Sequence, residues 1–193
     1  MKKMPCLFVR EFHGDGTFTI TEAVTPGCEW VLSGEGLATR KWDGTAVLVR
    51  EGLLYARYDA KNGRAPPVRA IPCTEAPDPV TGHWPHWVEA TRPEDRWIRE
   101  AAENSKAALH LDGTYEAIGP NINGNADEWP RHALLRHGAQ PLEMPSNWRT
   151  FDGIRAVLAD LPWEGIVFHH PDGRMCKIRR HDFGLPWPLR EKP

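Results

Sequence analysis

Short apolar runs recur along the chain and predict β-strands. They are "CLFVREF", "TAVLVREG", "LLYARYD", "GTYEAIG" and "GIVFHH", and each is bounded by Gly, Pro, Asp or Asn, as strands and hairpins usually are. The stretch "VREGLLYAR" predicts a hairpin that turns at Glu51–Gly52. A second hairpin, turning at Asp172–Gly173, is predicted by "FHHPDGRMCKIRR", since Gly beside an acidic residue suits a tight turn.

Two stretches have the spacing of helices. "PEDRWIREAAENSKAAL" begins with acidic residues and places Trp97, Ala101 and Ala108 on one face. "TFDGIRAVLADL" repeats its apolar residues at helical spacing, with Thr150 or Asp152 as the N-cap. The pattern predicts an α+β fold of mainly antiparallel sheets with flanking helices, in one domain over residues 1–193.

Residues 61–93 are rich in proline and form too long a segment to be a passive connector in a compact domain. We therefore interpret them as an ordered functional loop rather than a linker. Arg64 lies in this loop and is a candidate for contacting phosphate, although a solvated charge is the simpler interpretation.

The overall composition narrows the class of protein. The chain of 193 residues has a net charge of −2, which argues against a protein that coats long duplexes but not against one that grips a nucleic-acid end with a few cations. Four scattered cysteines without CxxC spacing favour reduced thiols inside the cell. The start "MKKMPCLFVREF" lacks the apolar core of a signal peptide, and no window approaches a membrane span. We expect a cytoplasmic protein that binds no membrane.

A lysine and an aspartate precede a glycine in the motif K-x-D-G, from Lys41 to Gly44. An amine nucleophile must lose its proton, and nearby cations such as Arg40 favour that loss. Gly44 would let the backbone come close to a ligand. The motif is short, however, and on this motif alone a turn with exposed charges is the favoured interpretation.

Three further stretches favour a functional role for Lys41 over an exposed turn. "TYEAIG" places Glu116 in the middle of a strand, where an unpaired carboxylate is costly to bury, and "WEGIVF" places Glu164 at the mouth of an apolar strand. "MCKIRRHDFG" puts Lys177 and Arg179 on one face of a strand, because side chains two apart point the same way. Together these residues could build a nucleotide site in which carboxylates hold ribose hydroxyls and a metal, and cations hold phosphates.

The order of these four motifs resembles the covalent nucleotidyltransferase superfamily, which contains DNA ligases, RNA ligases and mRNA capping enzymes. The chain is further similar to the RNA ligase 1 family, whose members include an ATP-dependent 5′-3′ RNA ligase. This similarity covers about Arg40 to Pro188 and is carried by "ARYDAK", "DPVTGHWPHW", "IGPNINGN", "EGIVFHHPDG" and "RRHDFGLPWP".

The resemblance implies a ligase-type adenylyltransferase core without a C-terminal OB domain. It also implies an ATP-dependent RNA ligase that uses Mg²⁺ or Mn²⁺, binds RNA ends and needs no obligate protein partner. Lys41 would be the nucleophile that attacks the α-phosphorus of ATP. Lys177 would stabilise charge on that phosphate, and Arg179 would assist it.

The remaining roles implied by the resemblance concern nucleotide, metal and RNA. Glu116 would bond the ribose hydroxyls, and Glu164 would place the metal or its waters. The other candidates for nucleotide binding are Arg40, Asp43, Gly44 and Arg57. The candidates for RNA binding are Arg57, Lys61, Arg64 and Asn123, the last lying in "NINGN", which is equally well a simple turn.

The chain departs from the wider pattern at one position. Many superfamily members carry an arginine two residues after the glycine of K-x-D-G, where this chain has Ala46. Arg57 is a candidate to fill that electrostatic need. Two other functions stay open: a capping-type guanylyltransferase, and a non-catalytic module that binds RNA ends or nucleotides. The histidines and cysteines lack the tetrad spacing of a zinc site.

Overall fold

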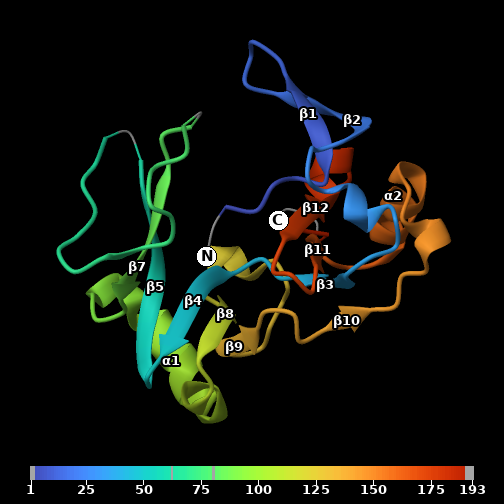
Figure 1. Ribbon diagram of the computed structural model, residues 1–193. Coiled ribbons are helices and arrows are strands. Elements are labelled where there is room, and N and C mark those ends of the chain that lie inside the picture. The colour runs from blue at the N-terminus through green and yellow to red at the C-terminus, as the bar shows by residue number, and fades with distance from the viewer. Residues whose placement is uncertain (1–2, 62, 80, 190–193) are drawn as a thin grey trace. The chain divides into compact units, whose positions relative to one another are not determined.

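The sheets of this protein are antiparallel and belong to two units of the chain, each with its own core (Figure 1). The computed structural model describes residues 3–61, 63–79 and 81–189. Unit 1 comprises Met1–Lys3 and Asp43–His137, and unit 2 comprises Met4–Trp42 and Gly138–Pro193. An α+β fold with mainly antiparallel sheets is confirmed, whereas the single domain over 1–193 stays a prediction.

Unit 1 contains a six-stranded sheet with the order β6-β7-β5-β4-β8-β9. Its strands are β4 (Thr45–Arg50), β5 (Leu53–Ala60), β6 (Ile71–Pro72), β7 (Trp84–Glu89), β8 (Gly113–Ile118) and β9 (Ala133–Arg136). Its helices are α1 (Arg96–Asn104) and the 3-10 helices η2 (Pro93–Asp95), η3 (Lys106–His110) and η4 (Asn123–Asn125).

One face of this sheet forms the core of unit 1. Val47, Val49 and Tyr115 lie on it and pack with Ala101 of α1, so the predicted helix at 93–109 is confirmed in its central part. The turn of the β4–β5 hairpin is also confirmed, since its two residues have φ of 54° and 76° and this backbone suits the twist of paired strands.

The prediction of one long loop at 61–93 is wrong for part of its length. The segment contains β6 and β7, and β7 pairs with both β5 and β6. Strand β7 was not predicted from the sequence because it contains Pro85, and a proline within an apolar run argues against an interior strand. The remaining residues of the segment are turns and irregular chain where the structure describes them.

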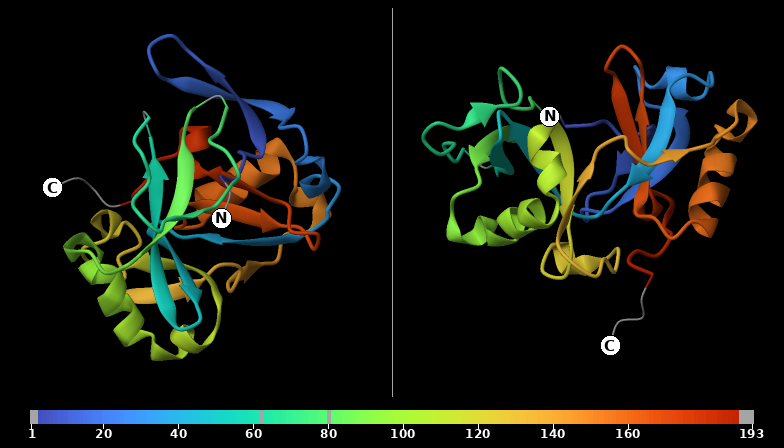
Figure 2. Two further views of the ribbon diagram at one scale, coloured as in Figure 1. Left: turned by 60° about the vertical axis from the view of Figure 1, so that its left-hand side comes forward. Right: turned by 90° about the horizontal axis from the view of Figure 1, so that it is seen from below.

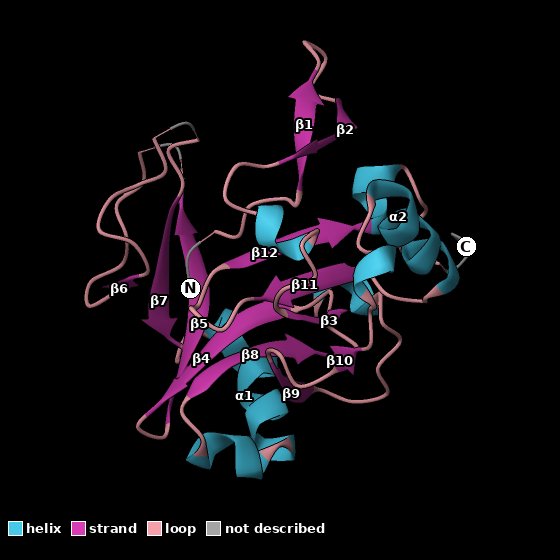
Figure 3. Ribbon diagram, turned by 45° about the vertical axis from the view of Figure 1, so that its right-hand side comes forward, coloured by secondary structure: helices cyan, strands magenta, loops and turns pink. Residues whose placement is uncertain are grey.

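Unit 2 contains a four-stranded sheet with the order β10-β3-β11-β12 and a separate hairpin of β1 and β2. Figure 3 shows β3, β11 and β12 side by side, and Figure 2 shows the β1–β2 hairpin projecting from them. The strands are β1 (Phe8–Phe12), β2 (Phe18–Val24), β3 (Leu37–Lys41), β10 (Pro141–Leu142), β11 (Gly165–His169) and β12 (Met175–Arg179). The helices are α2 (Phe151–Asp160) and the 3-10 helices η1 (Glu29–Val31), η5 (Ser146–Trp148) and η6 (Arg180–Phe183).

Helix α2 covers one face of this four-stranded sheet. Its fully buried residues Ile154 and Leu158 pack with Ile166 and Phe168 of β11. Thr150 caps the helix, since its side chain accepts a hydrogen bond from the N–H of Gly153. Of the two predicted N-caps, Thr150 and Asp152, the first is therefore confirmed. Within the described part of the chain, no helix has the length and apolar character that crossing a bilayer requires.

Candidate active site

The face of the unit 2 sheet that lies opposite α2 carries the predicted lysines. In the strand register, Lys41 of β3 and Arg179 of β12 both pair with Gly165 of β11. Residues that pair directly share a face, so these side chains lie in one cross-strand row with no side chain between them. The next row contains Lys177. Three cations predicted from two separate motifs therefore lie on one sheet face, opposite the face that packs against α2.

Lys41 forms an ion pair with Glu164. Its Nζ donates to Oε2 of Glu164 and lies 3.3 Å from the backbone oxygen of Trp42. Both side chains of the pair are largely withdrawn from water, with exposed fractions of 19% and 11%. Because a carboxylate buried alone would be costly, the lysine and Glu164 stabilise each other, and Glu164 fixes the position of the amine.

The positive charge of Lys177 is unfavourable at this position. The pKa of Lys177 is lowered from 10.5 to about 8, first by burial and then by the positive charges of Lys41 and Arg179. The carboxylate of Glu164 offsets only part of this lowering, so the lysine is partly deprotonated slightly above neutral pH unless further negative charge is supplied. A bound anion such as phosphate would supply that charge.

Arg179 is held by a carboxylate that the sequence motifs did not single out. Its Nη2 lies 3.2 Å from Oδ1 of Asp182, and Nη2 of Arg10 donates to the same oxygen at 2.6 Å. Asp182 is buried, with an exposed fraction of 4%. One carboxylate therefore positions two guanidinium groups, which leaves a net positive charge beside Lys177.

The spacing Arg-x-x-Asp in "RRHD" is a signal that could have identified Asp182, since the pair closes the first turn of η6. Nothing local to Arg10 indicates its part in the site. It reaches Asp182 from a residue separation of 172, through the tertiary placement of β1.

Arg40 does not join this group of cations. Side chains alternate along a strand, so Arg40 lies on the face of β3 opposite Lys41, where it pairs with Ile166. Its guanidinium lies 3.6 Å from the ring centroid of Trp42 and 5.5 Å from that of Trp163. These contacts stabilise the ends of β3 and β11, and the predicted role of Arg40 in nucleotide binding stays a prediction.

In unit 1, Asp43, Gly44 and Asn123 form a braced turn. The N–H of Asp43 donates to Asp127 at 2.8 Å, and the side-chain amide of Asn123 donates to the backbone oxygen of Gly44. A Cβ at Gly44 would lie 2.2 Å from the backbone oxygen of Ala117. Glycine is therefore required here for contact with β8, and Asn123 acts on backbone, as the turn interpretation of "NINGN" expected.

Glu116 is oriented by a histidine. Its Oε2 lies 2.8 Å from Nε2 of His137, and the other ring nitrogen of His137 is buried without a hydrogen-bond partner among the described residues. Ala46 pairs directly with Glu116 across β4 and β8. The position where the superfamily resemblance predicts an arginine thus faces this glutamate, and alanine leaves room beside it.

Arg57 lies on the same face of the unit 1 sheet as Glu116. Strand pairing places Tyr55, Leu48 and Thr114 in one cross-strand row, so their side chains share a face. Arg57 lies two residues after Tyr55, and Glu116 lies two residues after Thr114. Because side chains two apart on a strand point the same way, both lie on that face. The Nε of Arg57 donates to Asp59 at 2.9 Å. The structure thus supports the idea that Arg57 lies near the position of the missing arginine.

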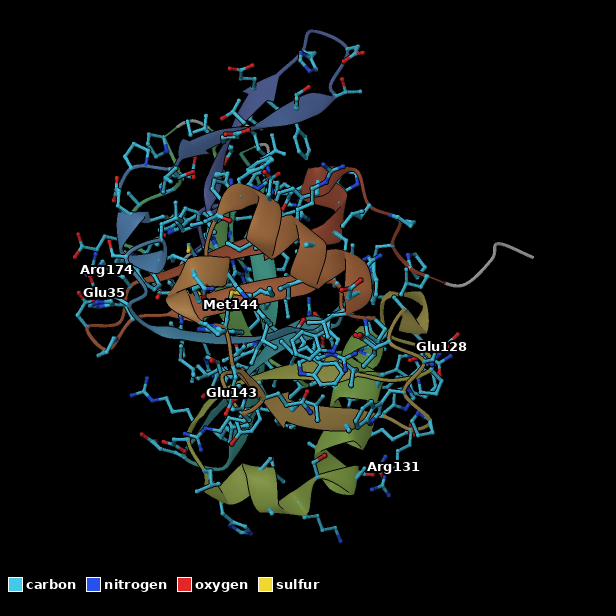
Figure 4. All side chains as sticks on the ribbon, turned by 90° about the vertical axis from the view of Figure 1, so that its right-hand side faces the viewer. Glu35, Glu128, Arg131, Glu143, Met144 and Arg174 are labelled. Carbon is cyan, nitrogen blue, oxygen red and sulfur yellow. The ribbon has the colours of Figure 1, made fainter. Side chains whose placement is uncertain are left out.

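The remaining candidates are exposed or serve other contacts. Lys61 and Arg64 are exposed after β5, and their predicted contact with RNA stays a prediction. His170 forms a surface network with Glu35, Asp172 and Arg174; Glu35 and Arg174 lie close together in Figure 4. Across the described residues, no group of three or more His, Cys, Asp or Glu side chains could hold a metal.

Comparison with known proteins identifies relatives of this chain. Residues 98–193 match the family model described as RNA ligase 1. RNA ligase 1 of Rattus norvegicus is 26% identical over an alignment that covers 97% of this chain and 82% of the relative. RNA ligase 1 of Pongo abelii is 36% identical over 110 residues, which are 50% of this chain and 32% of the relative.

These matches confirm the predicted resemblance to the RNA ligase 1 family. The alignment with the rat protein spans 279 residues, more than the 193 residues of this chain, so the relative carries segments that this chain lacks. The region matched by the family model contains Glu116, Glu164, Lys177 and Arg179.

Proposed function

Because the chain resembles the RNA ligase 1 family, we propose that it is an ATP-dependent RNA ligase that works through a lysyl-AMP intermediate. The observation that carries the proposal is the polar face of the unit 2 sheet. There an ion-paired lysine shares a cross-strand row with an arginine, and the next row carries a second, half-buried lysine. This is the combination of nucleophile and phosphate-binding cations that adenylyl transfer needs.

In the first step, Lys41 attacks the α-phosphorus of ATP. A bond forms between Nζ and phosphorus, the bond to the pyrophosphate oxygen breaks, and the nitrogen releases its proton. The ion pair with Glu164 has to open for this attack, because an ammonium group has no free electron pair. Glu164 therefore holds the amine in place until the nucleotide arrives.

Lys177 and Arg179 stabilise the charge that develops on the phosphate. Both lie on the face of the sheet that carries Lys41, and Asp182 fixes the direction of the Arg179 guanidinium. A preoriented donor in a partly buried site stabilises developing charge more than a solvated donor does. The positive charge that burial makes costly in the free protein is thus used when phosphate binds.

Two further steps complete ligation. An oxygen of the RNA 5′-phosphate attacks the phosphorus of lysyl-AMP and breaks the P–N bond, which leaves AMP on the RNA end and returns Lys41 to the amine. The 3′-hydroxyl of the second RNA end then attacks the 5′-phosphorus, and AMP leaves. Glu116 is proposed to accept hydrogen bonds from the ribose hydroxyls, with Arg57 as a binder of phosphate.

The residues around Lys41 fit a hydrated Mg²⁺. This cation takes oxygen ligands and is often bound by one or two carboxylates, several waters and substrate phosphates. Glu164 supplies such a carboxylate. The bound ion, Mg²⁺ or Mn²⁺, would neutralise part of the charge on the triphosphate and its leaving group.

The test is labelling of the protein with ATP radioactive at the α-phosphorus. We expect a phosphoramidate on the wild type, stable to alkali and released by acid, that transfers to 5′-phosphorylated RNA. Lys41→Ala should reduce labelling by more than about 10³-fold. Lys106→Ala changes an exposed lysine of η3 and should label normally.

Two results would overturn the proposal. If Lys41→Ala keeps the label, the nucleophile is another residue. If the wild type takes label only from GTP and passes it to a diphosphate end, the activity is that of a capping-type guanylyltransferase; if RNA binds but no label forms, the protein is a binding module.

A further inference from the structure

Unit 2 contains a cavity that the proposed chemistry at Lys41 does not use. Its volume is about 730 Å³, which lies within the ~300–1,000 Å³ typical of ligand sites. It is formed by the start of β2 and by the η6 segment. The residues that matter for the argument are Phe18, Ile20, His181, Asp182 and Leu185.

The cavity has an aromatic wall. The rings of Phe18 and His181 meet edge to face, with centroids 5.6 Å apart and an interplanar angle of 77°. His181 is exposed and Phe18 is half-buried, so part of this wall is open to a ligand. Aromatic side chains beside apolar ones are the usual surface for unpaired nucleobases, which stack or lie edge-on against them.

Positive charge borders the same wall. The guanidinium of Arg10 lies 4.8 Å from the centroid of the Phe18 ring and donates to Asp182. Asp182 lines the cavity and also binds Arg179, so one carboxylate faces two guanidinium groups. The Nε–H of Arg10 is buried and has no acceptor within the described residues. An unsatisfied buried donor is unfavourable, and a phosphate oxygen would satisfy it.

We propose that this cavity binds one unpaired nucleobase of the RNA substrate, with an adjoining phosphate at Arg10 and Arg179. The proposal rests on the proposed ligase function and adds the place where the RNA strand is held. The cavity lining does not include Lys41, Glu164 or Lys177, so its occupant is distinct from the adenylate attached to the nucleophile. Arg179 belongs both to this phosphate position and to the row of Lys41, which links the RNA to the reacting centre.

The proposal separates two activities that can be measured on the same protein. Phe18→Ala and His181→Ala should form lysyl-AMP from ATP within about twofold of the wild type, because neither residue contacts the nucleotide in the proposed mechanism. Binding and adenylylation of 5′-phosphorylated single-stranded RNA should fall about tenfold, the range expected for loss of one stacked base. Trp148→Ala, which removes a half-exposed aromatic residue of unit 2 outside the cavity, is the matched control and should behave as the wild type.

A scan with abasic RNA identifies the bound base. Strands that lack one base at successive positions are titrated against each variant by fluorescence anisotropy. The wild type should lose about tenfold in affinity at one position, whereas Phe18→Ala should bind that abasic strand and the intact strand equally. Phe18→Trp should restore the dependence on the base, and thermal denaturation checks that each variant is folded.

The outcomes distinguish this proposal from the proposed function. Equal effects of abasic positions in the wild type and in Phe18→Ala would overturn the cavity as a base site. Base-dependent binding without any lysyl-AMP would uphold the cavity and overturn the ligase mechanism. Loss of lysyl-AMP in folded Phe18→Ala would show that the cavity serves ATP rather than RNA, which also overturns the proposal.

Discussion

The two sheets present polar faces of different character, although both are antiparallel and both bury their opposite face against a helix. In unit 2, the cations Lys41, Lys177 and Arg179 gather on one face, and their carboxylate partners are Glu164 and Asp182. In unit 1, the polar face carries two compact pairs: Arg57 with Asp59, and Glu116 with His137.

This difference shows what each sheet is suited to bind. A surplus of partly buried positive charge is unfavourable in the free protein and becomes favourable only with an anion. A carboxylate oriented by a neighbouring imidazole costs little and offers an acceptor in a fixed direction. We therefore expect substitutions in unit 2 to trade stability against catalysis, and substitutions in unit 1 to change nucleotide affinity.

The largest expected effect within this comparison is that of Lys177→Met. Adenylylation should fall by about 10²–10³-fold, because a preorganised cation at the phosphate is lost. The same change should raise the free energy of unfolding at pH 7 by about 2 kcal/mol, since the pKa of Lys177 near 8 reports an unfavourable buried charge. Single-turnover labelling and urea denaturation measure the two effects. Lys106→Met should change neither, and a less stable Lys177→Met protein would contradict this interpretation of the charge.

The ionisation of Lys177 should also determine how stability and the adenylylation rate depend on pH. Its pKa in the folded protein, about 8, is below the 10.5 of the unfolded chain, so between these values the unfolded chain binds more protons and folding stability contributed by this group rises with pH. Catalysis should change in the opposite direction. The adenylylation rate at low ATP should fall by up to tenfold per unit above pH 8, as Lys177 loses its charge.

Lys177→Arg provides the control for this pH effect. A guanidinium keeps its charge at all these pH values, so the decline above pH 8 should disappear, while the rate at pH 7.5 stays within about tenfold of the wild type. A decline that persists unchanged in Lys177→Arg would assign it to another group.

A smaller effect is expected in unit 1, from His137→Ala. Loss of the imidazole leaves Glu116 free to rotate, so KM for ATP should rise about tenfold with little change in kcat. The preference for ATP over 2′-deoxy-ATP should shrink, because discrimination depends on the direction of the carboxylate. His110→Ala, an exposed histidine of η3, is the control. A drop in kcat with unchanged KM would mean that His137 acts in the chemistry instead.

Part of this site was readable from the sequence because it depends on local geometry. The period of two placed Lys177 and Arg179 on one face, and Gly52 and Gly173 marked the hairpin turns that the structure confirms. Other parts depend on contacts between distant segments. The ion pair between Arg10 and Asp182 joins residues 172 positions apart, and no local sequence pattern predicts such a pairing.

Ala46 shows the same limit at a single position. In the sequence it stands for an absent arginine, which suggests a missing charge. In the structure Ala46 lies opposite Glu116 in the strand register. Its small side chain leaves space beside the carboxylate, and the hydrogen-bond partner of Glu116 is His137. Register is set by the packing of the whole sheet, and for this reason the histidine partner could not be predicted from the motif.

The smallest expected effect concerns the His170 network on the β11–β12 hairpin, whose members are not among the proposed site residues. The hydrogen bond to Glu35, assisted by Asp172, raises the pKa of His170 above its usual 6.5. A raised pKa contributes stability that is fully present below pH 6.5 and is lost as the pH rises through the folded value. Because its partners Glu35 and Asp172 are exposed, these pairs contribute little, and His170→Gln should lower Tm by at most about 2 °C at pH 5.5 and not at all at pH 9.

The His170 network, whose partners are exposed, and the half-buried cations of unit 2 should also differ in their response to salt. In 1 M NaCl the small difference between wild type and His170→Gln at pH 5.5 should vanish, because salt screens exposed charges. The stabilisation by Lys177→Met should persist in the same salt, because the cost of that charge comes mainly from burial. If both effects disappear with salt, the unit 2 cations are solvated, and the trade of stability against catalysis that distinguishes the two sheets does not hold.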